Sequence, residues 1–199
     1  MKNSKEWFFR SAFLVSLYLL ELPAHAQNAT WTGSVSSVWG NPNNWTPVAD
    51  AQPFGPTQTA TFGTSSVTTS ITFFSPASSP GTLHFEAGAP QYSFDLHDPM
   101  DVASGPAGGI GIRNDSSNRP KFTIIPEFGG ISFNRSATAA NAVINNFALV
   151  NFFGTSTAGN ATITTDTVLT DDGNEFNFNV TNSGIPNVFV VAQGEGKKQ

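Results

Sequence analysis

The chain has 199 residues, a formal net charge of −5 and no cysteine. Its 9 lysines and arginines are too few to form a patch that neutralises several phosphates, which excludes nucleic acid as a partner. Without cysteine, the fold has no disulfide framework and depends on packing and backbone pairing. The 18 phenylalanines, together with frequent Thr, Ser, Asn and Gly, indicate strands and turns rather than helices.

Residues 1–26 have the pattern of a secretory signal peptide. Three basic residues open the chain, an apolar run follows, and two small residues then flank a histidine: Lys2, Lys5, Arg10, residues 12–20, Ala24 and Ala26. This pattern predicts cleavage after Ala26. The apolar run is shorter than a membrane span, which needs about 20 residues, so we expect contact with a membrane only during export. The alternative is an uncleaved anchor.

Residues 27–65 are rich in tryptophan, glycine and proline. Trp31, Trp39 and Trp45 all lie in this region. If the fold is a stack of repeats, its first repeat has no neighbour on one side and needs a cover. We therefore interpret the region as an N-terminal cap. The alternative is a platform on which sugar rings stack.

Short runs of alternating apolar and polar residues follow, separated by Gly, Pro, Asn and Asp turn signals. They predict strands at residues 59–62, 67–73, 82–85, 92–96, 121–125 and 175–180. No stretch after the signal has a long apolar period of 3.6 residues. The chain is therefore predicted to be all-β.

One segment of the chain occurs twice. Residues 138–144 (TAANAVI) align with residues 157–163 (TAGNATI), and the same offset carries Phe133 onto Phe152. A unit of this length, about 19 residues, is too short for a helix pair or a propeller blade, but it fits one coil of a parallel β-helix. We expect such a helix over residues 66–191, followed by a polar tail over 192–199. A sandwich or a barrel is the alternative.

The repeat also predicts which side chains face inward. Ala142 and Ile144 alternate with Val143, which places the Ala and the Ile on one face, and the second copy repeats this pattern. The small residues before them are expected to form a bend. In that bend Asn141 would stack on Asn160, because stacked side-chain amides stabilise such turns.

Three groups of residues together cover most of the span 29–165. They are residues 157–163; residues 109–116 (GIGIRNDS) with Phe122 and residues 131–133; and an opening with Trp31, Trp39, Trp45 and residues 59–62. These motifs resemble the autotransporter-associated β-strand repeat proteins. The resemblance implies a bacterial exported passenger built on a right-handed parallel β-helix. The translocator barrel that usually ends such passengers has no counterpart after Val191, so we expect either a truncated gene or another export route.

Few residues suggest chemistry. The densest polar cluster consists of Asp95, His97, Asp98 and Asp101, which could offer oxygen ligands to Ca²⁺. We interpret it instead as a solvated loop bounded by Pro99. Residues 171–174 (DDGN) lack the spacing of a complete Ca²⁺ loop and are interpreted as a turn. No catalytic, cofactor-binding or metal-binding residue is assigned.

Enzymes on parallel β-helices need a carboxylate pair, or a base beside a cation, on one exposed face. Residues 131–165 contain no Asp or Glu, and the central cations are Arg113, Arg119, Lys121 and Arg135. One of these cations could pair with Asp115 or Glu127, although no spacing favours this, and folding could bring Arg113 near Asp95, Asp98 and Asp101.

The sequence therefore predicts a monomeric, non-enzymatic passenger that is secreted or displayed at the cell surface, with a structural or adhesive role. Its partner would be an unknown surface or glycan ligand. The alternative is a carbohydrate-active β-helix, either a polysaccharide lyase or a glycan-binding module.

Overall fold

The computed structural model describes residues 28–48, 52–53, 55–74, 80–103, 110–166 and 189–193. The expected signal peptide, the turn at 171–174 and the strand at 175–180 lie outside these residues.

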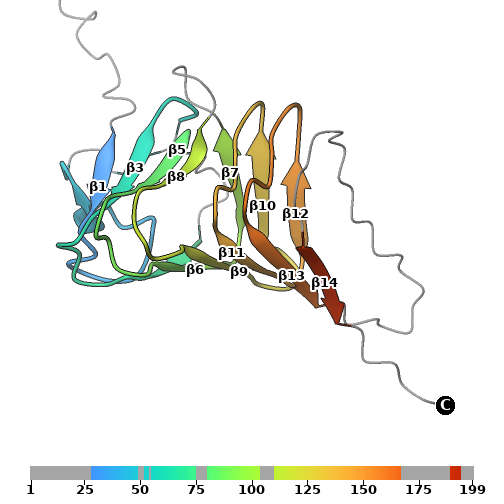
Figure 1. Cartoon of the computed structure of the whole chain (residues 1–199). Coiled ribbons are helices and arrows are strands. Elements are labelled where there is room, and N and C mark those ends of the chain that lie inside the picture. Colours follow the sequence, from blue (N-terminus) through green and yellow to red (C-terminus); the bar gives the residue numbers. More distant parts are fainter. Residues whose placement is uncertain are drawn as a thin grey trace, which may run out of the picture.

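The described residues form three sheets in which nearly all strands pair in parallel (Figure 1). Sheet A contains, in spatial order, β2 (Trp45–Thr46), β1 (Ala29–Trp31), β3 (Thr59–Phe62), β5 (Thr82–Phe85) and β8 (Gly111–Asn114). Sheet B contains β14 (Phe189–Gln193), β13 (Thr162–Asp166), β11 (Val143–Asn146), β9 (Lys121–Ile124), β6 (Ser93–Leu96) and β4 (Ser70–Phe73). Sheet C contains β12 (Leu149–Phe152), β10 (Gly130–Asn134) and β7 (Pro99–Ala103). A short 3₁₀ helix, η1 (Pro42–Asn44), precedes β2. The all-β prediction is confirmed.

From β3 to β13, consecutive strands belong to different sheets. From β8 the chain passes to β9 in sheet B and β10 in sheet C, and then returns to pair Thr138 with Gly111 of sheet A. The next strand, β11, lies beside β9 in parallel. In Figure 1 the strands accordingly follow one another along one direction, from blue to orange. Residues far apart in sequence therefore become lateral neighbours.

The core contains the inward side chains of all three sheets. In β3, β5, β6, β9 and β11, buried residues alternate with partly exposed ones, as the alternating sequence requires. Phenylalanines stack across neighbouring strands at ring-centroid distances of 4.7–5.0 Å: Phe62 on Phe85, Phe94 on Phe122, and Phe133 on Phe152. Phe133 and Phe152, which the offset of the sequence repeat aligns, are thus stacked neighbours.

The offset of the sequence repeat is a true pairing register. Val143 pairs with Thr162, Gly130 with Leu149, and Thr138 with Thr157. Ala142, Ile144, Ala161 and Ile163 are all buried, as predicted. Earlier steps of the stack are longer, as the pairing of Lys121 with Val143 and of Thr82 with Gly111 shows. The repeat thus gives the number of residues between paired positions for these strands only. Earlier pairs of neighbouring strands are separated by more residues.

The expected asparagine contact is displaced by one step. The register places Asn160 at the position equivalent to Asn141. The hydrogen bond between side-chain amides, however, runs from Asn114 Nδ2 to Asn141 Oδ1 at 2.9 Å, on the other side of Asn141. Within the described part of the chain, no hydrogen bond joins the Asn141 and Asn160 side chains. Asn114 is the last residue of β8 and pairs with Phe85 of β5. It therefore shares the inward position of Phe85, and from there its side chain reaches Asn141.

The two bends of the repeat differ in strain, which predicts opposite effects of two substitutions. Gly159 has a φ of 58° and its counterpart Ala140 a φ of 50°, a conformation that disfavours any residue with a Cβ atom. A Cβ on Gly159 would also lie 2.8 Å from the Ala140 carbonyl oxygen. We expect Gly159→Ala to lower the free energy of unfolding by about 1–2 kcal/mol and Ala140→Gly to raise it by up to about 1 kcal/mol. Urea unfolding followed by circular dichroism measures both, and a less stable Ala140→Gly variant contradicts the strain argument.

The three tryptophans are interior residues at the N-terminal end of the fold. Trp31, Trp39 and Trp45 are 1%, 0% and 1% exposed. Trp45 meets Trp31 and Trp39 edge-to-face at centroid distances of 5.1 and 4.7 Å. These rings cannot stack on a sugar while they are buried, so they do not form the alternative glycan platform. The antiparallel strand β2 covers the edge of β1, and parallel pairing already begins at β1 and β3, inside the region interpreted as a cap.

Candidate functional site

The most connected group of charged side chains lies on the outer face of sheet A. His84 of β5 and Arg113 of β8 are register partners. Both point outward because they alternate with buried Leu83 and Ile112. Asp115 directly follows β8, and its backbone N–H donates to the Phe85 carbonyl oxygen at 2.9 Å. The sheet thereby brings a histidine, an arginine and a carboxylate to one surface position.

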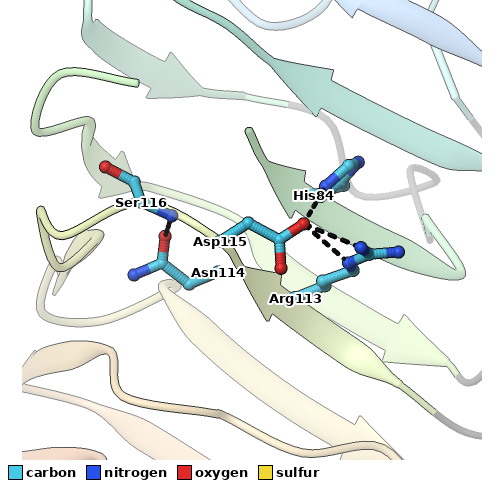
Figure 2. A network of polar contacts seen from close by, with 5 residues as sticks. All are labelled: His84, Arg113, Asn114, Asp115 and Ser116. Carbon is cyan, nitrogen blue, oxygen red and sulfur yellow. Dashed lines mark hydrogen bonds and ion pairs between the residues drawn. The ribbon is translucent and has the colours of Figure 1, made fainter. Parts of the chain in front are cut away.

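The Asp115 carboxylate bridges the two neighbouring strands (Figure 2). Its Oδ2 atom lies 2.8 Å from Arg113 Nη2 and accepts a hydrogen bond from Arg113 Nε at 2.9 Å. The same oxygen lies 2.9 Å from His84 Nε2. Of the pairings between the central cations and Asp115 or Glu127, the structure therefore contains the one between Arg113 and Asp115. Glu127 lies in the turn after β9.

Two neighbouring residues hold the turn that presents Asp115. The Ser116 N–H donates to Asn114 Oδ1 at 3.1 Å, as Figure 2 shows, and the Ser116 hydroxyl donates to the Ala89 carbonyl oxygen at 2.6 Å. Ser116 is itself buried. The carboxylate position is therefore fixed by backbone pairing on one side and by the buried Ser116 on the other.

The electrostatics of the cluster favour the ionised form of Asp115. Hydrogen bonding from Arg113, and then from His84, holds the pKa of Asp115 below its ordinary value of 3.8. Such a carboxylate is a poor general acid near neutral pH, because general acids need a raised pKa. The arrangement links two strands by charge and presents the outer atoms of Arg113 and His84 to solvent.

Acid titration should reveal this link. A lowered folded-state pKa stabilises the fold above the unfolded value, and this contribution is lost as the pH falls through about 4 and below. We expect the parent to melt above Asp115→Asn at pH 7, by a small margin because the groups are exposed, and this margin to disappear as the pH falls below about 4, so that the parent curve falls more steeply over that range. Melting curves from pH 7 to pH 3 measure this, and raised salt should shrink the difference. Superimposable slopes would contradict the assignment.

A second carboxylate, that of Glu86, follows the strand that pairs with β8. Glu86 follows β5 as Asp115 follows β8, and these two strands pair in register. The Glu86 carboxylate, however, lies over Gly63, where its Oε2 is 2.6 Å from the place of an added Cβ. Since Gly63 follows β3, on the far side of β5 from β8, Glu86 leans away from Asp115. The two acids therefore do not face each other as glycosidase carboxylates do.

The expected loop around His97 is a tight corner between two strands. The interpretation as a loop is wrong for Asp95 and Asp101, because Asp95 lies in β6 and Asp101 in β7. Pro99 begins β7 by pairing with Gly130 of β10. The His97 ring stacks on Phe74 at a centroid distance of 4.3 Å. Among the residues that the structure describes, no three His, Cys, Asp or Glu side chains are grouped to hold a metal ion.

Arg113 and Arg119 contact other parts of the chain. Arg113 contacts Asp115 on sheet A, and within the described ranges it forms no ion pair with Asp95 or Asp98. Arg119 is directed at the backbone: its Nε donates to the Asn141 carbonyl oxygen at 2.6 Å and its Nη2 to that of Ala142 at 3.0 Å. It therefore acts as a structural staple.

No family model, curated protein or solved structure matches this chain. Over the described residues, the structure contains no helix that is long and apolar enough to cross a membrane. The fold and the site define an all-β protein of parallel sheets with a charged strand-bridging cluster on one face.

Proposed function

We propose that the chain is a right-handed parallel β-helical passenger, exported and displayed or released at the cell surface, with a structural or adhesive role. The observation that carries the proposal is the succession of parallel registers in three sheets, each step returning the chain beside the strand it left. Right-handed winding is part of the proposal because crossovers between parallel strands are right-handed in about 98% of cases. The resemblance to autotransporter-associated repeat proteins agrees with it.

A scaffold role fits the distribution of side chains better than catalysis does. The aromatic residues at the N-terminal end are buried, and the most connected carboxylate is engaged by two basic side chains. Many outward positions on sheets A and B carry short polar residues: Thr59, Thr61, Thr82, Ser70, Thr72, Ser93, Thr123, Asn145, Thr162 and Thr164. Short side chains on a regular sheet present an even surface, which suits a display scaffold.

Export can be tested directly. The full chain is expressed in a Gram-negative host, and antibodies raised against purified protein locate it in cytoplasmic, periplasmic, outer-membrane and medium fractions. We expect a processed form that begins at Gln27 and is found at the surface or in the medium. An Ala26→Arg variant, which spoils the cleavage site, should accumulate unprocessed. A parent chain that stays unprocessed in the cytoplasm overturns the proposal.

The absence of enzymatic activity is tested with polysaccharides. Acidic and neutral polysaccharides are incubated with the purified chain, with and without Ca²⁺, while reducing ends and unsaturated products are followed. We expect no turnover. Turnover that disappears in Asp98→Ala or Arg113→Ala would replace the scaffold role with a carbohydrate-active one.

A further inference from the structure

Exposed apolar side chains line the corner between sheets B and C. Four residues occupy one position on successive strands, each directly after the end of a sheet B strand: Phe74, His97, Ile125 and Phe147. The backbone ladder continues through this position, because His97 N–H donates to Phe73 O at 3.1 Å, Ile125 N–H to Leu96 O at 2.9 Å, and Phe147 N–H to Ile124 O at 3.3 Å. At about 4.8 Å per strand, the row is about 14 Å long.

Several of these side chains are open to solvent. Phe74 is 54% exposed and Phe147 is 42% exposed, and the ring of His97 stacks on Phe74. Phe128, in the turn that follows Ile125, is 71% exposed. These five residues are named here the corner ridge. Contiguous exposed apolar side chains mark interaction sites on soluble proteins, whereas scattered ones do not.

Acidic side chains flank the corner ridge. Asp98 follows His97, Glu127 precedes Phe128, and Asp95 is the outward residue of β6 next to His97. Both ion pairs of the described residues involve Asp115, so none of these three carboxylates has a basic side chain within 4.0 Å in the described part. The corner segments 97–99, 125–129 and 147–148 contain no lysine or arginine. The ridge is therefore apolar and bordered by negative charge.

We propose that the corner ridge binds a basic amphipathic polypeptide segment, in which Lys or Arg alternates with apolar residues. Apolar side chains of the partner would cover Phe74, Phe128 and Phe147, while its cations would meet Asp95, Asp98 and Glu127. Complementary charge of this kind steers association and selects the partner. The same carboxylates disfavour a second copy of this chain, whose net charge is also negative. The inference names the kind of ligand that a protein with the proposed adhesive role would bind. It rests on the proposed function only for its biological setting.

Binding is measured by fluorescence anisotropy with a labelled synthetic peptide of alternating Lys and Leu, added to the purified full chain. A peptide with Glu in place of Lys is the matched control ligand. We expect binding of the Lys peptide that weakens with salt, and affinity at least about tenfold lower in the double variant with Phe74→Ser and Phe147→Ser. Asp98→Asn with Glu127→Gln should weaken binding and reduce its salt dependence.

Val67→Ser is the matched control variant, because Val67 is 77% exposed but lies between β3 and β4, away from the ridge. It should bind like the parent. All variants change exposed or partly exposed side chains and should keep the parent melting temperature, which circular dichroism checks.

Any of the following peptide-binding or sedimentation results would overturn the inference. They are equal binding of the Glu and Lys peptides, unchanged binding in the double variant, and self-association in sedimentation that the double variant abolishes. Co-sedimentation with phosphatidylcholine vesicles that depends on the ridge would likewise overturn it, since the occupant would then be lipid. If the peptide does not bind but processing at Gln27 and surface location are observed, the proposed function stands without the inference. If the chain is not exported, the peptide-binding result is unaffected.

Discussion

Replacing Trp45 by alanine should lower the free energy of unfolding by about 3–5 kcal/mol, the range measured for large aromatic residues truncated in a core. The ring is 1% exposed and lies between Trp31 and Trp39. Its Nε1–H donates to the Trp39 carbonyl oxygen at 2.8 Å, so truncation also leaves a buried acceptor without this donor. Urea unfolding followed by far-ultraviolet circular dichroism measures the loss.

Trp45→Phe separates the two contributions to that loss. Phenylalanine keeps an aromatic ring but lacks the indole N–H, so its stability should fall between the parent and Trp45→Ala. Glycan-array binding is measured on the same proteins. An alanine variant that melts like the parent but loses glycan binding would mean that the tryptophans form a sugar site and not a cap.

Replacing Arg119 by alanine should lower the free energy of unfolding by about 3 kcal/mol, because hydrogen bonds from a charged donor each contribute about 1.5–3 kcal/mol and do not add fully. The guanidinium donates to the carbonyl oxygens of Asn141 and Ala142 and to the Thr162 hydroxyl, the last at 2.8 Å. Arg119 precedes β9, Ala142 precedes β11 and Thr162 begins β13, so one side chain joins three successive strands. Urea unfolding measures the loss.

Arg119→Lys is the matched control for this staple. Lysine keeps the charge but offers a single ammonium group and not a planar fork, so it should recover only part of the lost stability. Arg135→Ala should change stability far less, because Arg135 is exposed and forms no ion pair within the described ranges. Equal effects of Arg119→Ala and Arg135→Ala would contradict the role of the three contacts.

Local sequence is sufficient for β3, β5, β6 and β9 and for the face that each one buries, but it did not predict β7, β8, β10 or β12. The expected strand at residues 59–62 coincides with β3 and that at 82–85 with β5, while 92–96 and 121–125 each exceed the observed strand by one residue. Alternation has a period of two along an extended chain, so burial can be read from near neighbours alone. The register of the repeat was also predictable, because two matching segments require matching positions.

Contacts between neighbouring strands could not be predicted in this way where the number of residues between the strands differs from that of the repeat. His84 and Asp115 lie 31 residues apart in the sequence, and Asn114 and Asn141 lie 27 residues apart. A search at the offset of the repeat finds neither pair. The strand β7 was missed for a related reason: its segment PMDVA contains Pro and Asp, which are depleted in strands, and it becomes a strand through pairing with β10.

The direction of a side chain could be predicted from the sequence, whereas its neighbour on the next strand could not, for one physical reason. A residue's inward or outward direction depends on backbone geometry within its own strand, which its immediate neighbours determine. Which side chain lies beside it on the next strand depends on the number of residues in the intervening connections, and surface connections vary in length at little thermodynamic cost. The cluster at Asp115, the Arg119 staple and the corner ridge all consist of such lateral neighbours, and only the folded chain brings them together.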